Sequence, residues 1–448
     1  MNSMKFKLKR IYMLKKVFAV VMMMVLFSQI IFAESQTSTL SFTQLLKIAS
    51  QNNLSIQMAQ QKVKVAEAQL SQAWSAVFPK VTLEAGANRL DSPQTRLANI
   101  GMADYYSAKA GVNQLLFNGS VGPAIVASDY LLKGANAELQ TSKEDVFFNV
   151  IKIYLTLIQL KEQKQVLQDS LDSLNKLLNK VQQMQISGLV TKTDVLRTKS
   201  GISAMKVGMI NLQNTIDVLR SNLNMLVNSD VSRLVTEEAD IDKLYNTVTY
   251  NPVLKCSDIL ENRGDYRQLD NTASLLKTAV DINSGAWFPT LVFVANSGYS
   301  GRNNGFNFSD NDREWMYGIN GSWSFFDFGQ TGAKIDEAKA NYKRMEQQLA
   351  QVKLAIDTEL FNISLNISAN KEKVNSLQEE EQVDIETYNL VNARYTVGEV
   401  THLELIDAQN TLADARSRLV SARIDVVLEL LKWLRATGKL NEFINKGV

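Results

Sequence analysis

The amino-acid sequence predicts a chain of mixed α and β structure, in which two pairs of β-strands alternate with long coiled-coil helices in a tandem internal duplication. Three observations predict this class. Motifs recur about 210 residues apart, two segments alternate apolar and polar residues as half-buried strands do, and apolar residues elsewhere follow the four-three spacing of coiled coils. Only five prolines interrupt the 448 residues, which favours long continuous helices.

The first 33 residues are predicted to be a signal peptide. Six basic residues and no acidic residue accompany an apolar run from Val17 to Phe27, which is too short to cross a bilayer but suits the hydrophobic part of a signal peptide. We place the cleavage point after Ala33. An N-terminal membrane anchor is the alternative, and Met4 and Met13 are alternative start residues.

Charge and composition exclude several classes of protein. Without residues 1–33 the chain holds 42 basic and 46 acidic residues, and this balance argues against nucleic acid as a partner. The single cysteine, Cys256, rules out an internal disulfide. The single histidine, His402, rules out histidine-paired triads and multi-histidine metal sites, so we expect neither an enzyme nor a cofactor. We interpret His402 as an exposed helix residue.

Three blocks of sequence recur in the same order and indicate a duplication. The pair Phe78-Pro79 returns as Phe288-Pro289, and Phe117-Asn118 returns as Phe326-Asp327. The third block contains Gly188, Val190, Thr191 and Asp194, which return as Gly398, Val400, Thr401 and Glu404. We therefore divide the chain into a first repeat (34–227), an irregular insert (228–262), a second repeat (263–438) and a C-terminal tail (439–448).

Each repeat is predicted to begin with a helix that ends at a proline. These helices cover Phe42 to about Val77 and about Asp265 to Ala286. Pro79 and Pro289 follow them, and proline disfavours the helical conformation in the residue before it and lacks an amide proton.

A pair of strands follows in each repeat, at about 81–90 and 105–117 and at about 290–299 and 314–326. In the last of these segments Trp315, Tyr317, Ile319, Trp323 and Phe325 share one face, while small and polar residues take the other. Such alternation over a dozen residues predicts a strand with one apolar and one polar face.

Long helical hairpins complete each repeat. The helix from about Val121 to Ser187 could extend about 100 Å at 1.5 Å per residue. Its apolar residues at 167, 171, 174, 178 and 181 follow a coiled-coil seam. Gly188 and Gly398 lie at the hairpin turns, where a left-handed residue is needed.

The strands set a physical requirement on the whole assembly. A dozen residues of tilted strand matches a bilayer, and the aromatic face of 315–325 suits lipid. Four strands cannot close a barrel, and an open edge in lipid is prohibitively costly, so several chains must contribute. Three chains would supply twelve strands. The alternative is a water-soluble sheet that packs this face on helices.

The order of these elements resembles the TolC-type outer-membrane efflux family over nearly all of the chain after the signal peptide. The segments 188–194 and 395–408 resemble the two periplasmic tips of that family. The resemblance implies a homotrimer with a twelve-stranded barrel in outer-membrane lipid and a helical tunnel in the periplasm. It also implies docking with a periplasmic adaptor protein and with an inner-membrane pump or ABC exporter.

The resemblance assigns roles to particular residues. The adaptor-docking tips are Ser187, Gly188 and Leu189 in the first repeat and Val397, Gly398 and Glu399 in the second. A link that holds the tunnel closed corresponds to Asp194 and Tyr395, and Val400 stands where the family has an arginine. Two acidic residues at the tunnel entrance correspond to Glu404 and Asp407. The alternative for each of these pairs is the solvated face of a coiled coil.

The function implied is an exit duct of a multicomponent efflux or type I secretion system. Members of the family serve drug efflux, metal efflux and protein secretion. A structural coiled-coil tether of the cell envelope, without a pore, is the alternative; it explains the heptads but not the duplicated strands with two faces.

Overall fold

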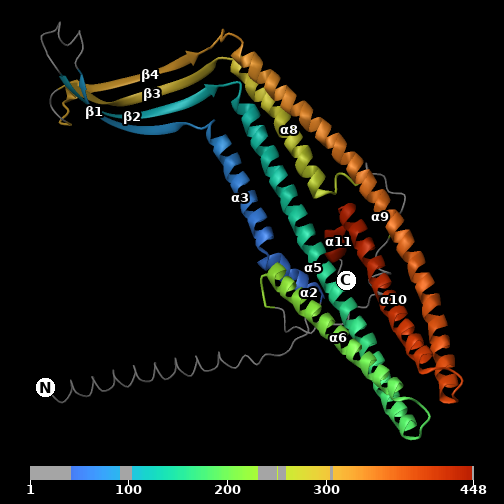
Figure 1. Cartoon of the computed structure of the whole chain (residues 1–448). Coiled ribbons are helices and arrows are strands. Elements are labelled where there is room, and N and C mark those ends of the chain that lie inside the picture. Colours follow the sequence, from blue (N-terminus) through green and yellow to red (C-terminus); the bar gives the residue numbers. More distant parts are fainter. Residues whose placement is uncertain (1–41, 91–102, 231–249, 251–258, 303–305, 446–448) are drawn as a thin grey trace, which may run out of the picture.

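The computed structural model describes residues 42–90, 103–230, 250, 259–302 and 306–445. The predicted signal peptide, Cys256 and most of the predicted insert lie outside these ranges. The described part is elongated, with the sheet at one end and the turns of two helical hairpins at the other (Figure 1).

The four predicted strands form one antiparallel sheet in the order β1-β2-β3-β4. Their bounds are Lys80–Leu90, Ala103–Phe117, Thr290–Arg302 and Arg313–Ser322. The register aligns Leu83, Ala110, Ser297 and Trp315 across the strands, and aligns Glu84, Lys109, Gly298 and Glu314 in the next row. Neighbouring rows face opposite sides, so one face is mainly apolar and the other mainly polar.

The predicted end of the last strand is wrong by four residues. Strand β4 stops at Ser322, which pairs with Thr290, the first residue of β3. The preceding residue on the β3 side is Pro289, which has no amide proton to offer a partner. Trp323 and Phe325 therefore continue the alternating pattern without belonging to the strand.

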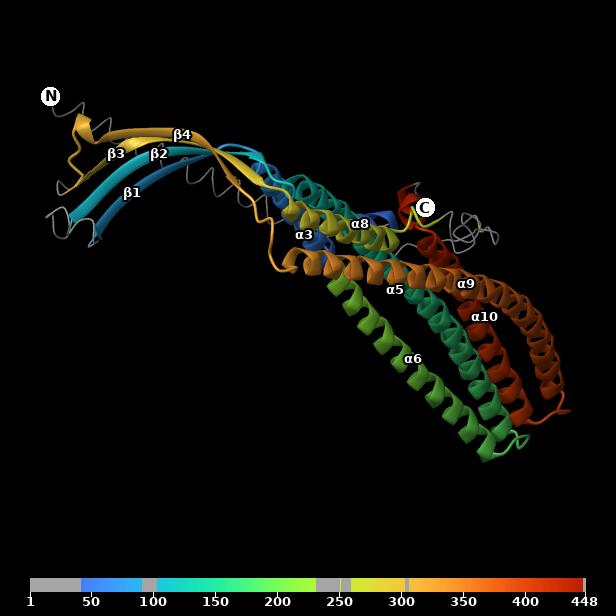
Figure 2. The ribbon, with the colours of Figure 1, turned by 90° about the horizontal axis from the view of Figure 1, so that it is seen from above.

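No helix in the described part of the chain covers either face of the sheet (Figures 1 and 2). Trp315 and Tyr317 are 69% and 68% exposed. The described helices therefore do not cover the apolar face, as the alternative of a sheet packed on the helices of its own chain would require.

The helices come in two similar series. The first contains α3 (Leu54–Ser75), α5 (Val121–Ile186) and α6 (Lys192–Val227). The second contains α8 (Gly264–Ser284), α9 (Gln330–Thr396) and α10 (His402–Ala436). Helix α5 has 66 residues, which gives a length of about 100 Å. None of the described helices has an apolar stretch long enough to cross a membrane.

Two predicted segments differ from the structure. The first helix is broken into α2 (Phe42–Asn52) and α3, because the Asn53 side chain accepts hydrogen bonds from the amides of Ser55 and Ile56 and caps α3. Its amide nitrogen also donates to the Leu226 carbonyl, at 2.6 Å. Residues 440–445, which we expected as part of a tail, form α11, and Leu440 is fully buried in the core.

The largest core lies midway along the molecule, where α2, α5, α10 and α11 meet (Figure 1). Side chains such as Tyr154, Leu155, Leu430 and Trp433 are buried there, and each large apolar side chain contributes about 2–3 kcal/mol of burial. Helix α5 lies between α6 and α10, and α9 packs outside α10. This order leaves α6 on one flank and α9 on the other.

Candidate functional site

Both hairpin tips are built on the same local geometry. Gly188 and Gly398 have φ angles of 75° and 81°, the left-handed conformation predicted from the sequence. The amides of Leu189 and Glu399 each reach back to a carbonyl five residues earlier, at 2.9 and 3.0 Å. This arrangement satisfies carbonyls that the helix end leaves without partners.

The six residues assigned to docking are all exposed at the ends of the hairpins. Leu189 and Val397 are 72% and 71% exposed, so each tip presents an apolar side chain to its surroundings. Arg394 and Glu399 form an ion pair at 3.1 Å beside the second tip. The tips therefore offer apolar contacts with charge beside one of them, while their role in docking stays a prediction.

A threonine begins each return helix. The Thr191 hydroxyl accepts a hydrogen bond from the Asp194 amide, and Thr401 does the same for Glu404. Glu404 and Asp407 are exposed on the first turns of α10, three residues apart. The positive end of the helix dipole stabilises a carboxylate at this position. The stability of the helix alone would therefore explain why an acidic residue is found at Glu404.

Asp194 and Tyr395 are close in space, but no hydrogen bond links them in the single chain. The Asp194 carboxylate accepts hydrogen bonds from the Thr191 amide and hydroxyl, at 3.0 and 2.8 Å. Burial opposes ionisation of Asp194, but these bonds outweigh it and hold its pKa below the ordinary value. Tyr395 is buried, and its hydroxyl has no partner among the described residues. Burial, and then the charge of Asp194, raise the pKa of Tyr395.

The interpretation of His402 as an exposed residue is wrong. Its side chain is 5% exposed, and its ring centroid lies 5.7 Å from that of Tyr395. Its Nε2 atom lies 2.8 Å from Oγ1 of Thr198, a fully buried residue of α6. His402 therefore connects the two hairpins immediately behind their tips.

The heptad pattern of α10 contains the signal that would have found this position. Leu405, Gln409 and Leu412 form a buried seam, and His402 lies three residues before it in the same register. Its nearness to a tip glycine had suggested exposure, but the seam runs up to the first residue of the helix.

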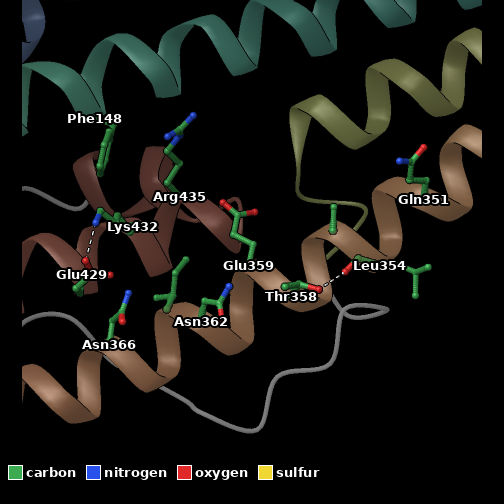
Figure 3. A pocket seen from close by; sticks show the side chains of 12 residues that line it. Phe148, Gln351, Leu354, Thr358, Glu359, Asn362, Asn366, Glu429, Lys432 and Arg435 are labelled. Atoms are coloured by element: carbon green, nitrogen blue, oxygen red, sulfur yellow. Dashed lines mark hydrogen bonds and ion pairs between the residues drawn. The ribbon is translucent and has the colours of Figure 1, made fainter.

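A groove lies between α9 and α10 near the middle of the molecule (Figure 3). This groove of about 760 Å³ is bordered by Leu354, Asn362, Glu429 and Arg435. One oxygen of Glu429 pairs with Lys432 at 2.6 Å, and the other is buried without a partner among the described residues. The described part of the chain contains no cluster of three or more residues suited to hold a metal ion.

Comparison with known proteins identifies a family. The family model described as outer membrane efflux protein matches two segments of the chain, residues 45–229 and 256–439. The efflux pump protein TtgC of Pseudomonas putida is 22% identical over 417 residues, which cover 89% of this chain and 84% of that protein. TolC of Escherichia coli is 21% identical over 383 residues, covering 83% and 77%.

Solved structures share the fold. The outer membrane protein VceC of Vibrio cholerae superposes with a TM-score of 0.78 at 20% identity, covering 89% of this chain and 96% of the other. The CmeC outer membrane channel of Campylobacter jejuni gives a TM-score of 0.79 at 16% identity, covering 89% and 86%.

Proposed function

The chain belongs to the outer membrane efflux protein family, and we propose that three copies close into a single duct with a twelve-stranded barrel in the outer membrane. The protein is an outer-membrane efflux channel, and it serves as an exit duct. The observation that supports a trimer is that both the sheet and the helical part of the single chain end in two open flanks.

The sheet supplies the first pair of flanks. Among the described residues, strands β1 and β4 each pair on one side only, so both present unpaired amides and carbonyls at their outer edges. In lipid these groups have no water to bond, and four strands are too few to close on themselves. Pairing β4 of one copy with β1 of the next removes every edge once the ring closes.

The helices supply the second pair. On α6 and α9, which form opposite flanks, several large apolar side chains are more than half exposed in the single chain: Leu196, Val207, Ile210, Val218 and Met225 on α6, and Leu354, Phe361, Leu365, Val383 and Leu390 on α9. Exposed apolar seams of this length mark surfaces that another protein covers. The α6 seam of one copy and the α9 seam of the next can cover each other.

The proposed duplication makes the ring nearly sixfold. Supporting it are the two similar helix series, the shared tip geometry of Gly188 and Gly398, and the two separate matches of the family model. Three chains would then provide six similar units around one axis.

The tips are proposed to be the surfaces through which the duct contacts its partner proteins. The exposed apolar residues Leu189 and Val397 would contact a periplasmic adaptor, which couples the duct to an inner-membrane pump or ABC exporter. Glu404 and Asp407 would place six carboxylates around the entrance in a trimer. The relative TtgC is named an efflux pump outer membrane protein, which supports a place in such an assembly. A tether without a pore finds no support among these relatives.

A flank variant tests the proposal. Phe361→Asp puts a charge in the α9 seam, and we expect it to abolish both the trimer band in unheated gels and conductance in planar bilayers. Asn362→Asp is the matched control, because this exposed neighbour lines the groove beside α10. A Phe361→Asp protein that still forms trimers and conducts like wild type would contradict the proposed ring.

A further inference from the structure

The hydrogen bond between His402 and Thr198 joins the two hairpins of one chain at the tip end. His402 is the first residue of α10, and Thr198 lies on the second turn of α6. Both side chains are buried, and they lie beside an apolar cluster that includes Leu174, Val195 and Leu405. We call the His402–Thr198 pair the tip latch.

The geometry assigns the tautomer of the imidazole. The Thr198 hydroxyl donates its only proton to the Asp194 carbonyl at 2.9 Å, so it acts as acceptor toward His402. The proton of the neutral ring therefore resides on Nε2. The other nitrogen, Nδ1, is a bare acceptor that is buried without a partner in the described part of the chain.

Protonation of this ring is unfavourable for three reasons. A proton on Nδ1 would be a buried donor with no acceptor there. The positive end of the α10 dipole lies at the ring's own residue, and Arg197 of α6 adds a like charge. Burial is the largest effect, and it lowers the pKa of His402 despite the opposing field of Asp194.

Among the described residues, the other charged groups around the ring do not supply an acceptor. The Asp194 carboxylate is bonded to Thr191, and Lys180 of α5 lies 5.7 Å from the ring centre of Tyr395. The Tyr395 ring of α9 lies beside the imidazole, and the two ring planes are tilted by 49°. On α10 itself, Glu404 and Asp407 point outward and are exposed.

We propose that His402 is a positioning residue of the entrance, which holds the hairpins together when neutral and releases them when protonated. The proposal rests on the proposed function, because it takes the tips to be the entrance of the duct. Asp194 and Tyr395 do not bond to each other in this chain, and the tip latch provides a link between the hairpins in the same place.

The direction of the pH response follows from linkage. A released, hydrated imidazole has its ordinary pKa of about 6.5, whereas the latched ring has a lower pKa. Above the ordinary value both states are neutral and the latch is fully stable. As the pH falls through that value, only the released state binds a proton, so acid favours release. Each unit between the two pKa values changes the equilibrium by about tenfold.

Two measurements on the full chain test the tip latch. Because the sequence has one histidine, ¹⁵N-histidine solid-state NMR of untagged protein reports on this ring alone. We expect the neutral form protonated on Nε2 at neutral pH. In planar bilayers we expect open probability to rise severalfold as the pH falls from about 7.5 to about 5.5.

Variants separate the latch from a merely structural role. His402→Gln keeps an amide donor that does not titrate, so it should stay closed and lose the pH response. Adding Leu403→His to that variant places an imidazole on the neighbouring residue, which is 47% exposed, and should not restore the response. Thr198→Val should open the entrance at neutral pH, whereas Thr198→Ser should behave like wild type.

The failures of the two proposals are distinguishable. A protein that conducts at no pH would contradict the proposed duct, while the NMR measurement still decides the latch. A ring protonated on Nδ1 at neutral pH, or a His402→Gln variant that keeps the full pH response, would overturn the tip latch.

Discussion

At the scale of single residues, the tip glycines are required by backbone conformation and not by space. A Cβ added at Gly398 would meet no atom within 4 Å, yet its φ angle of 81° is one that other residues rarely adopt. Gly398→Val should therefore strain the tip by about 1–2 kcal/mol. We expect export to be lost while trimers still form and insert, because only the tip is altered.

A control on α9, the helix that leads to this tip, isolates the effect. Gly332 also has no atom within 4 Å of an added Cβ, but its backbone is helical. Gly332→Val should leave export unchanged in an assay of the transported compound. Normal export by Gly398→Val and by the equivalent Gly188→Val would show that docking does not involve the tips.

The acidic pair Glu404 and Asp407, which we propose to lie at the entrance, makes a second prediction at this scale. Six carboxylates around a narrow opening attract cations and exclude anions. The double variant Glu404→Gln with Asp407→Asn should lose cation preference and block by multivalent cations in planar bilayers. Glu372→Gln with Glu379→Gln makes the same charge change on exposed residues of α9, far along the chain from the tip. Unchanged selectivity in the first variant would remove these acids from the entrance.

Residue roles were the least predictable part of the sequence. The left-handed conformations of the two tip glycines could be predicted, because a helix that ends in a tight hairpin turn favours glycine at that position. The environment of His402 did not, because it depends on Thr198, which lies 204 residues away in the chain. A contact between residues so far apart in the chain depends on how the two hairpins pack. The spacing of residues near the tip does not predict it.

At the scale of elements, the two faces of the sheet should differ in their tolerance of charge. Tyr317 lies on the apolar face and Asn320 on the polar face, and both are exposed in the single chain. If the apolar face contacts lipid, Tyr317→Lys should cost about 2–4 kcal/mol near the bilayer centre. We expect poor recovery of this variant in the outer-membrane fraction and normal recovery of Asn320→Lys. Equal recovery would argue that Tyr317 does not face lipid.

Element types were predictable where periodicity was strong, but their ends depended on partners. Both long hairpins followed from heptads and turn glycines, and two of the four strands, at 105–117 and 314–326, followed from clear alternation. Strand β4 ended early because its pairing partner β3 begins only at Thr290, directly after Pro289. The break at Asn53 was not predicted, because the apolar periodicity of the sequence continues through it. The break depends on one asparagine, which caps α3 and also bonds to α6.

At the scale of the whole molecule, the number of chains in the assembly depends on how many copies are needed to close the sheet and the ring of helices. The single chain leaves β1 and β4 with open edges and leaves apolar seams on α6 and α9. The sequence could indicate that more than one chain is needed, because four strands cannot close. The number three comes from the strand count of a barrel and the resemblance to a family, since no local pattern encodes the curvature of the ring.

The mass of the membrane-extracted protein tests the closed duct most directly. Native mass spectrometry of the full-length protein in detergent should give a single assembly of three chains. The proposed barrel needs twelve strands and therefore three chains, so monomers should appear only after denaturation. A stable, extracted monomer would contradict the account, because its sheet edges and its helix seams would then be open in the native state.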